Sequence, residues 1–288
     1  MTTSARSPQA TWKSKIAADA RHDGKNQIYR HVLLMRRSNL GMGKYSDKNA
    51  VITGGSSGMG LAVAELLVRG GARVVITGRS QATLDAARKR LGENAVAVRG
   101  DVASLPDLDT LAGHVKSELG SIDALFVNAG IAPLTPLDST TEEVYDELFA
   151  INVKGAFFTV QKLAPLLSAN AGVVLTTSIA NVIGMVDTSV YAAGKAALRS
   201  MARTFSAELL PRGIRVNAIS PGPIDSGILE TMMSVEAAEQ FRAERIASNP
   251  MGRYGTVEEF AVAAAFLAFD ATYTTGVELA VDGGETQL

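Results

Sequence analysis

The sequence predicts an α/β fold in which helices cover both faces of one parallel sheet. Seven short, β-branched runs follow one another from residue 49, and each is almost continuously apolar, as strands covered on both faces are. Segments with the 3.6-residue period of amphipathic helices lie between these runs. Strands that alternate with helices form a parallel sheet through right-handed crossovers, so we expect a single doubly wound, Rossmann-type domain with a seven-stranded sheet.

The elements follow from these patterns in chain order. The predicted strands are NAVIT (49–53), RVVIT (73–77), AVAVR (95–99), ALFVN (124–128), GVVLTT (172–177), IRVNAI (214–219) and VELAV (277–281). The predicted helices are 58–69, 81–91, 104–119, 141–167, 190–210 and 256–269. Residues 223–255 interrupt the alternation with a long, Met-bearing stretch bounded by Pro and Gly, which is typical of an inserted lid. We expect one domain over 45–288, with this lid inserted in it.

Residues 1–44 differ in charge from the rest of the chain. They hold 9 Lys and Arg against 2 Asp and Glu, whereas residues 45–288 hold 19 against 27. We expect a basic, disordered extension, with Met42 as a candidate natural start. An organelle presequence is the alternative, because the segment is rich in Arg and Ser and poor in acids. The acidic remainder argues against nucleic acid as the main partner.

The composition excludes several kinds of site. The chain has no cysteine, which excludes disulfides, thiolate zinc sites and cysteine nucleophiles. Three scattered histidines, at 22, 31 and 114, are too few for a histidine-rich metal site, so no metal is expected. No apolar run approaches the length of about 18 residues that a membrane span needs. Because a chain without cysteine suits a reducing compartment, we expect a cytoplasmic protein.

A glycine-rich turn, TGGSSGMG, joins the first predicted strand to the first predicted helix. Glycines in such a turn let the backbone approach a phosphate at the helix N-terminus. The spacing of Gly54, Gly58 and Gly60 is one residue longer than the common dinucleotide fingerprint. Strand-to-helix turns favour glycine in any case, so it is the position after the first strand of the alternation that predicts nucleotide binding.

The same turn contains the pattern G-x-S-x-G, with Ser56 at the place of a hydrolase nucleophile. A serine hydrolase needs a histidine downstream, and only His114 follows Ser56, within a predicted helix. The nucleophile also normally follows a central strand, whereas this turn follows the first. A serine hydrolase is therefore a remote alternative.

The end of the second strand bears on which dinucleotide binds. An NAD site usually places an acid there to accept a hydrogen bond from the ribose 2′-hydroxyl. Gly78 occupies that place, and Arg79 follows it. A guanidinium suits a 2′-phosphate, because it forms charge-assisted hydrogen bonds. The sequence therefore favours NADP(H) over NAD(H); the alternative for Arg79 is an exposed arginine in a loop.

Tyr191 and Lys195 stand four residues apart at the head of a predicted helix and therefore share one of its faces. Such pairs also occur on ordinary surface helices. A phenol near its reference pKa of about 10 is mostly protonated at neutral pH. A lysine ammonium one turn away favours the phenolate and is expected to lower the tyrosine pKa toward a useful acid–base range.

Residues 45–288 resemble a short-chain dehydrogenase/reductase. The motifs that carry the resemblance are Thr53-Gly54-x-x-x-Gly58-x-Gly60, GDV with Asp101, NAG at 128–130, Asn152, Ser178, Tyr191-x-x-x-Lys195, SPGPIDS at 220–226 and the terminal VDGG. Each motif is weak alone, but their order and spacing together are specific. The resemblance implies an enzyme that interconverts an alcohol and a carbonyl compound (a ketone, an aldehyde or a 3-oxoacyl-like substrate) with NADP(H).

The resemblance also implies a role for each of four catalytic residues. Tyr191 acts as general acid and base on the substrate oxygen. Lys195 lowers the pKa of Tyr191 and binds the nicotinamide ribose. Ser178 orients the substrate oxygen, and Asn152 supports a water-linked proton relay.

Further residues are implied to bind the cofactor, in addition to Arg79, Tyr191 and Lys195. They are Gly54, Ser56, Ser57, Gly58, Met59 and Gly60 at the diphosphate, Asp101 and Val102 at the adenine, Asn128, Ala129 and Gly130 toward the nicotinamide, and Pro221, Gly222, Ile224 and Ser226 at the carboxamide. Helices 141–167 and 190–210 pair subunits in this family, so a homotetramer is expected; a stripe buried within one monomer is the alternative.

The substrate class and the class of protein leave alternatives open. The residues expected to line the pocket, among them Ile131, Ile179 and Val182, are mostly apolar and favour a neutral carbonyl compound. Arg242 and Arg245 in the lid would favour an acidic one if they faced inward. A non-catalytic nucleotide sensor or scaffold of the same fold is the alternative to an enzyme, although a binding module needs no acid–base tyrosine.

Overall fold

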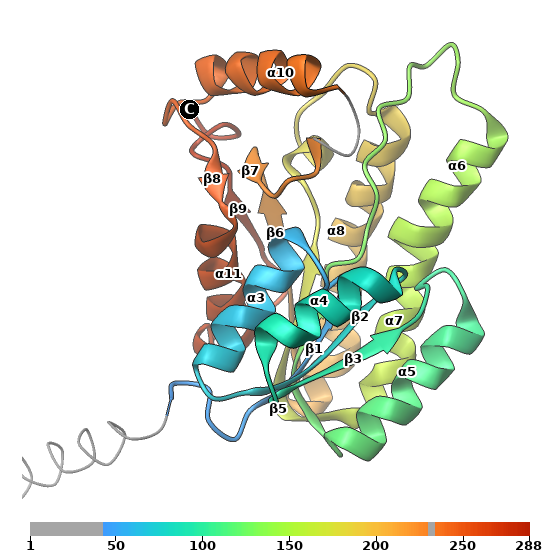
Figure 1. The fold of residues 1–288 in the computed structure, drawn as a ribbon, viewed down its shortest axis with the longest axis vertical. Coiled ribbons are helices and arrows are strands. Elements are labelled where there is room, and N and C mark those ends of the chain that lie inside the picture. Colours follow the sequence, from blue (N-terminus) through green and yellow to red (C-terminus); the bar gives the residue numbers. More distant parts are fainter. Residues whose placement is uncertain (1–42, 230–233) are drawn as a thin grey trace, which may run out of the picture. The chain divides into compact units, whose positions relative to one another are not determined.

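Seven parallel strands form the central sheet of the protein, in the order β3-β2-β1-β4-β5-β6-β9 (Figure 1). Their bounds are β1 Asn49–Thr53, β2 Arg73–Gly78, β3 Ala95–Arg99, β4 Ile122–Val127, β5 Leu167–Thr176, β6 Arg215–Pro221 and β9 Glu278–Val281. The computed structural model describes residues 43–229 and 234–288, so the predictions for the basic segment fall almost entirely outside the described residues. The predicted doubly wound, seven-stranded fold is confirmed.

Helices cover both faces of this sheet. One face carries α3 (Gly58–Arg69), α4 (Gln81–Leu91) and α11 (Val257–Ala265), and the other carries α5 (Leu105–Glu118), α7 (Ala156–Leu163) and α8 (Ser189–Leu209). The strands β1 to β6 therefore supply alternate side chains to two cores, which explains why they read as continuous apolar runs.

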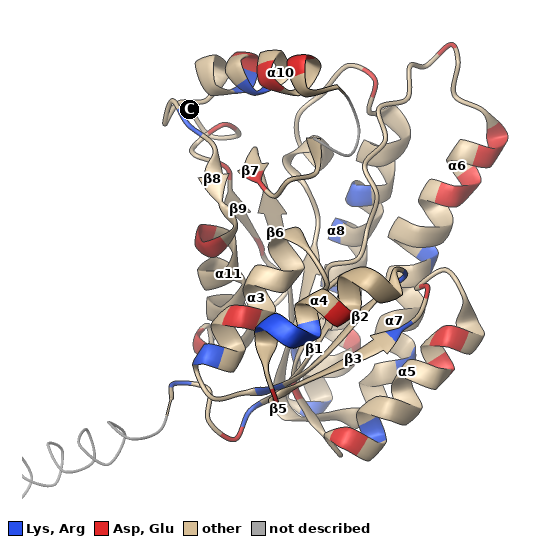
Figure 2. Ribbon diagram, in the orientation of Figure 1, with Lys and Arg blue, Asp and Glu red and all other residues tan. Residues whose placement is uncertain are grey.

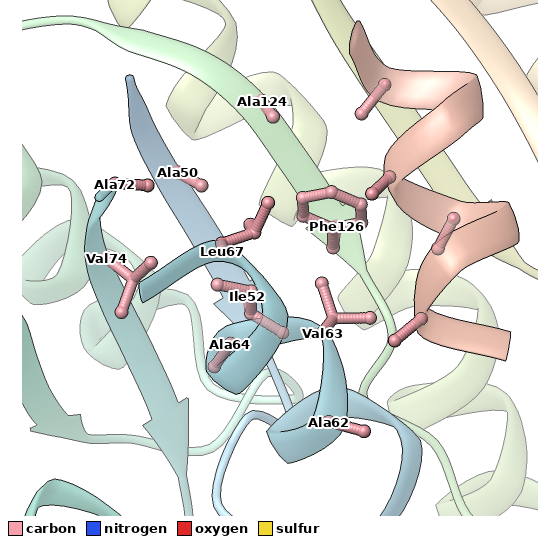
Figure 3. Close-up of a cluster of buried hydrophobic side chains, with 14 of the residues drawn as sticks. Ala50, Ile52, Ala62, Val63, Ala64, Leu67, Ala72, Val74, Ala124 and Phe126 are labelled. Carbon is pink, nitrogen blue, oxygen red and sulfur yellow. The ribbon is translucent and has the colours of Figure 1, made fainter. Parts of the chain in front are cut away.

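The core under α3 illustrates this alternation. Ile52 and Phe126 point toward α3 and pack with Leu67, as Figure 3 shows, whereas Val51 belongs to the core on the opposite face. All four of these side chains are buried. Burial of such side chains supplies most of the hydrophobic free energy of folding, at roughly 1.5–3 kcal/mol for each.

The predicted helix 141–167 is interrupted in its middle, and the strand that follows it begins earlier than predicted. It forms α6 (Glu142–Phe149), a π-helical segment (Ala150–Gly155) and α7, and then a 3₁₀ turn that contains Pro165. Proline cannot continue the helical hydrogen-bond ladder, so the chain leaves the helix here and β5 begins at Leu167, not at residue 172. The predicted helix, 141–167, therefore ends close to the observed boundary, and the error lies in the strand, which begins five residues earlier than predicted.

The predicted lid has its own secondary structure. β7 (Ile224–Asp225) pairs with β8 (Gly255–Thr256) in a small parallel sheet, and α10 (Val235–Ser248) lies between them in the chain. Figure 2 shows both acidic and basic residues along α10. Residues 230–233 of the lid lie outside the described residues.

The strand order reverses between β1 and β4, because the chain runs outward from β1 to β3 and then returns to the other side of β1. In open α/β sheets, ligands bind beyond the carboxyl ends of the strands at such a switch point. In the described portion of the chain, no helix combines the length and apolarity that crossing a bilayer requires.

Candidate active site

A cavity of about 230 Å³ opens at this switch point, beyond the ends of β1, β2, β3 and β4. The predicted cofactor residues that line it are Gly54, Ser56, Ser57, Arg79, Asp101, Val102, Ala129 and Gly130. The cavity wall also includes residues that the sequence did not single out, namely Thr77, Ser80, Thr83, Gly100 and Ile151. Thr77 and Gly100 stand at the ends of β2 and β3, so the rule that sites follow strand ends would have found them.

The glycine-rich turn is so tightly folded that two of its positions exclude a side chain. Gly54 has a φ of +65°, in the left-handed region, and a Cβ on Gly60 would lie 2.2 Å from the Gly54 carbonyl oxygen. The turn leads into α3, whose N-cap Ser57 makes no side-chain capping bond and whose first turn holds no acid. A close backbone approach and an uncapped helix N-terminus together fit the diphosphate of a dinucleotide.

Asn128 ties together the ends of three strands behind this cavity. Its Nδ2 donates to the carbonyl oxygens of Thr53 and Gly54 at 3.3 and 3.4 Å, and its Oδ1 accepts from Thr176 Oγ1 at 3.3 Å. Its backbone N–H donates to Thr53 Oγ1 at 3.0 Å. These bonds hold β1, β4 and β5 in register at the site, and the cofactor contact of Asn128 stays a prediction.

The remaining predicted cofactor residues do not all converge. Ser226 lies beside the glycine turn, since a Cβ on Gly58 would be 3.3 Å from the Ser226 carbonyl oxygen. Ile224, by contrast, lines a separate cavity of about 330 Å³ next to the C-terminal residues 282–284. The Met59 side chain packs against the core under α3.

The end of β6 also faces this C-terminal segment. Pro221 is the last residue of β6 and pairs with Val281 of β9. A Cβ on Gly222 would lie 2.8 Å from the Cα of Asp282, so this position has room for no side chain. The predicted carboxamide contacts of Pro221 and Gly222 stay predictions.

Asn152 occupies the π-helical segment between α6 and α7 and is almost fully buried. Its Oδ1 accepts from the Ile131 N–H at 2.9 Å, and its Nδ2 donates to the Ile131 carbonyl oxygen at 2.8 Å. Single π-helical turns often mark functional sites, because the wider turn redirects a side chain. Here it directs Asn152 to the chain that follows β4.

Lys195 joins this group from α8. Its Nζ donates to the Thr176 carbonyl oxygen at 2.9 Å and lies 5.6 Å from the centroid of the Tyr191 ring. A Cβ on Gly130 would lie 3.0 Å from Asn152 Oδ1 and 3.5 Å from Lys195 Nζ. Since Gly130 lines the cavity, Asn152 and Lys195 stand directly behind its wall.

Ser178 follows β5 and faces Tyr191. Its hydroxyl accepts from the Ala180 N–H at 3.2 Å, which caps a short 3₁₀ helix (Ile179–Asn181), and it also hydrogen-bonds the Tyr191 phenol. The four predicted catalytic residues therefore come from three parts of the fold, namely the π-helical segment, the end of β5 and α8, and Asn152 and Lys195 reach the cavity wall at Gly130.

Burial shifts the pKa of the two titratable groups in opposite directions. It raises the pKa of Tyr191 above its ordinary value, and the hydrogen bond from Ser178 opposes this only in part. It lowers the pKa of Lys195 to about 8. The expectation that Lys195 lowers the Tyr191 pKa is therefore not met in this arrangement, because the loss of solvent around the phenol outweighs other influences.

The hydrolase alternative finds no support in the geometry. The Ser56 hydroxyl accepts from Thr83 Oγ1 at 3.4 Å. Across residues 43–229 and 234–288 the one histidine is His114, which is exposed on α5. Ser56 therefore has no described histidine to act as its base.

Both lid arginines point to acids of the same chain. Arg242 Nη2 lies 3.2 Å from Asp225 Oδ1, and Arg245 pairs with Glu285 near the C-terminus. The Arg245–Glu285 pair is well shielded, with side chains 19% and 9% exposed. The two lid arginines that could have bound an acidic substrate are thus paired with carboxylates of this chain.

Comparisons with known proteins show the family to which the chain belongs. A family model described as enoyl-(acyl carrier protein) reductase matches residues 54–286. The chain is 41% identical to the oxidoreductase asL5 of Sarocladium schorii over 85% of this chain and 98% of that protein. It is 33% identical to 2-(S)-hydroxypropyl-CoM dehydrogenase 3 of Xanthobacter autotrophicus, over 84% and 98%. A crystal structure titled short-chain dehydrogenase/reductase, glucose/ribitol dehydrogenase, from Brucella melitensis superposes with a TM-score of 0.80 at 29% identity, covering 86% of this chain and all of that one.

The chain belongs to the short-chain dehydrogenase/reductase family. It is an oxidoreductase that acts on CH–OH groups, and the family uses a nicotinamide dinucleotide, NAD(P), which the glycine turn fits. This membership sets aside the serine hydrolase, and the relatives, which are named oxidoreductases and dehydrogenases, support an enzyme over the non-catalytic sensor.

Replacing Lys195 with Met is expected to change how stability depends on pH. Because the pKa of Lys195 is about 8 in the folded chain and 10.5 unperturbed, burial opposes protonation. The free energy of unfolding of the wild type therefore rises, relative to Lys195→Met, by about 2 kcal/mol between pH 7 and pH 10. Urea unfolding at several pH values measures this gain, with Lys48→Met, a half-exposed amine, as the control. Parallel curves for wild type and Lys195→Met would contradict the lowered pKa.

Proposed function

We propose that this protein is an NADP(H)-dependent oxidoreductase that interconverts an alcohol and a carbonyl compound, with Tyr191 as the general acid and base. The observation that carries the proposal is that Asn152 and Lys195 lie beside Gly130 in the cavity wall, with Tyr191 next to both Lys195 and Ser178. The bound cofactor supplies or accepts the hydride. The chain itself must hold the substrate oxygen and move one proton.

Tyr191 and Ser178 divide this work at the substrate oxygen. Burial raises the pKa of Tyr191, so the phenol keeps its proton at neutral pH and donates it as a carbonyl becomes an alcohol. The Ser178 hydroxyl accepts from Ala180 N–H, which leaves its own proton for the substrate oxygen or for Tyr191. In the oxidative direction the same phenol accepts the proton.

Lys195 and Asn152 support the proton path behind Tyr191. With a pKa of about 8, Lys195 is mostly protonated at neutral pH and can return a proton toward the phenol or hold a ribose hydroxyl. Asn152 has one donor and one acceptor position left after its two bonds to Ile131, which suits a water-linked relay.

The variant Tyr191→Phe tests the mechanism. Loss of the phenolic proton is expected to lower kcat at least about 100-fold, while the dissociation constant for NADPH, measured by fluorescence titration, stays close to that of the wild type. Tyr273→Phe, which alters a fully exposed tyrosine, is the matched control and should behave as the wild type. Undiminished turnover by Tyr191→Phe would rule out this mechanism.

Two guanidinium groups support the preference for NADP(H). Arg79 and Arg99 line a pocket of about 350 Å³ that adjoins the main cavity, and Arg99 Nε donates to the Arg79 carbonyl oxygen at 3.1 Å. The two carboxylates in this pocket are engaged: Asp107 accepts from the Asp101 N–H at 2.8 Å, and Asp101 accepts from the Ala103 N–H at 2.9 Å. The pocket thus offers donors to a 2′-phosphate.

Arg79→Ala is expected to raise the KM for NADPH at least about tenfold and to leave the KM for NADH nearly unchanged, because a charge-assisted hydrogen bond contributes about 1.5–3 kcal/mol. Steady-state kinetics with both cofactors measure this. Arg69→Ala, on the surface of α3, controls for loss of positive charge. Equal increases for the two cofactors would argue against a 2′-phosphate site at Arg79.

The substrate we propose is a neutral, apolar carbonyl compound or alcohol. The lid arginines are directed to Asp225 and Glu285. Apolar side chains are exposed in the loops that follow β4 and β5, among them Leu134, Val182 and Val186. A hydrogen bond from Thr135 N–H to the Asp187 carbonyl oxygen, 2.8 Å long, joins these loops into one apolar rim. A turnover screen of ketones, sugars, steroids and acyl thioesters with both cofactors identifies the substrate.

We also propose that the enzyme is a homotetramer assembled through α6, α7 and α8. An apolar groove of about 690 Å³ lies on these helices and is lined by Phe149, Val153, Phe157, Phe158 and Met201, among others. Phe157 is 38% exposed and stacks edge-on with Phe158, at 5.2 Å between ring centroids. Such a face suits a second copy of the same surface.

Phe157→Glu is expected to reduce the assembly to dimers or monomers, because it places a charge in an apolar contact. Sedimentation velocity at several protein concentrations measures the change. Leu137→Glu, at an exposed position outside the groove, is the control. An unchanged sedimentation coefficient for Phe157→Glu would show that this groove is not an interface.

A further inference from the structure

Three residues of α8 stand in one line along the helix: Tyr191, Lys195 and Arg199, spaced at four-residue intervals. This line faces the end of β5, where Thr176, Thr177 and Ser178 follow one another. Tyr191 hydrogen-bonds Ser178, and Lys195 donates to the Thr176 carbonyl oxygen. Two of the three residues at the strand end are therefore held by α8 directly.

Thr177, the residue between them, is held through Glu278 on β9. Its Oγ1 donates to Glu278 Oε1 at 2.6 Å, and the other carboxylate oxygen lies 3.3 Å from Arg199 Nε. Arg199 is fixed in turn by a 3.0 Å bond from its Nη1 to the Gly276 carbonyl oxygen. The side chain of Glu278 is only 12% exposed, so its charge is neutralised by Arg199 within the protein.

Glu278 also reaches the residues that follow Ser178. Asn181 Nδ2 donates to Glu278 Oε1 at 3.0 Å and to the Ser178 carbonyl oxygen at 2.5 Å. Asn181 ends the 3₁₀ helix whose N-cap is Ser178. The same carboxylate thus holds the residue before Ser178 and the turn after it.

The orientation of the Ser178 hydroxyl depends on this turn. Its Oγ accepts from the Ala180 N–H, which lies within the 3₁₀ helix between Ser178 and Asn181. If the turn shifts, the Ala180 N–H no longer fixes which side of the Ser178 oxygen accepts, and the hydroxyl loses its orientation relative to Tyr191 and the substrate oxygen. Active-site groups need support of this kind, because a misplacement of about 1 Å can cost 100-fold in rate.

We infer that Glu278 is a positioning residue, which with Arg199 and Asn181 orients the Ser178 hydroxyl toward the substrate oxygen. Glu278 lies behind Ser178 and acts through it. The inference rests on the role of Ser178 in the proposed function.

Glu278→Leu tests the inference, because leucine keeps the size of the side chain and removes the acceptor. With NADPH and the carbonyl compound that turns over fastest in the screen, kcat is expected to fall at least about tenfold, while the dissociation constant for NADPH does not change. Glu278→Gln, which can still hydrogen-bond Thr177 and Asn181, should recover at least about a third of the wild-type kcat.

Glu65→Leu is the matched control for a purely structural effect. Glu65 is likewise a shielded carboxylate, 11% exposed and paired with Arg69 and Arg90, but it lies on α3 away from Ser178. Its replacement should lower the melting temperature as Glu278→Leu does, and leave kcat unchanged. A kcat for Glu278→Leu equal to that of the control would overturn the inference.

The double variant Ser178→Ala/Glu278→Leu separates this inference from the proposed function. If Glu278 acts through Ser178, the double variant should be no slower than Ser178→Ala alone. Losses that multiply would overturn the positioning role and leave the role of Ser178 intact. If Ser178→Ala alone turns over normally, the proposed role of Ser178 fails, and the inference fails with it.

Discussion

The burial of one lysine side chain is the constraint on which the rest of the site depends. Lys195 Nζ lies in the interior and donates to the Thr176 carbonyl oxygen at 2.9 Å. A buried ammonium is costly unless its hydrogen bonds are satisfied, so α8 must meet the end of β5 at this point. That requirement brings Tyr191, one turn earlier on α8, against Ser178, two residues further along the chain from Thr176.

The same burial has an electrostatic consequence for both titratable groups that we propose to be catalytic. Removing water favours neutral forms, and it therefore raises the pKa of Tyr191 and lowers the pKa of Lys195 to about 8. Burying this lysine lowers the free energy of unfolding at neutral pH, and destabilising groups of this kind are common at functional sites. As a result, a protonated phenol stands beside an amine whose pKa, about 8, is close to neutral pH.

In the lid, by contrast, the arginine charges are neutralised in ion pairs. Arg242 and Arg245 of α10 direct their charges to Asp225 and Glu285, which anchors the lid on both β7 and the C-terminal segment. The loops that follow β4 and β5 expose apolar side chains instead. Arg199–Glu278 behind Ser178 is likewise an ion pair, and the apolar surface of these loops is where we propose that the substrate binds.

Local sequence was enough for much of the fold. The apolar runs and their spacing determined the parallel sheet, and the positions of Gly54 and Gly60 determined a turn that only glycine can form. Four separated residues were predicted by resemblance to be a catalytic set; that role stays a prediction, and the structure places them near one another. These features could be found because each depends on neighbours in the chain or on motifs with fixed spacing.

Other features were decided by tertiary structure alone. The π-helical turn at Asn152 interrupts a helical periodicity that continues on both sides of it, and β5 begins at Leu167, before the apolar run that predicted it. The bond from Thr177 to Glu278 joins residues 101 positions apart, which no local pattern records. The direction of the Tyr191 pKa shift also required the fold. Residue spacing reveals which charges are near, whereas the removal of solvent, which dominates here, depends on everything packed around the group.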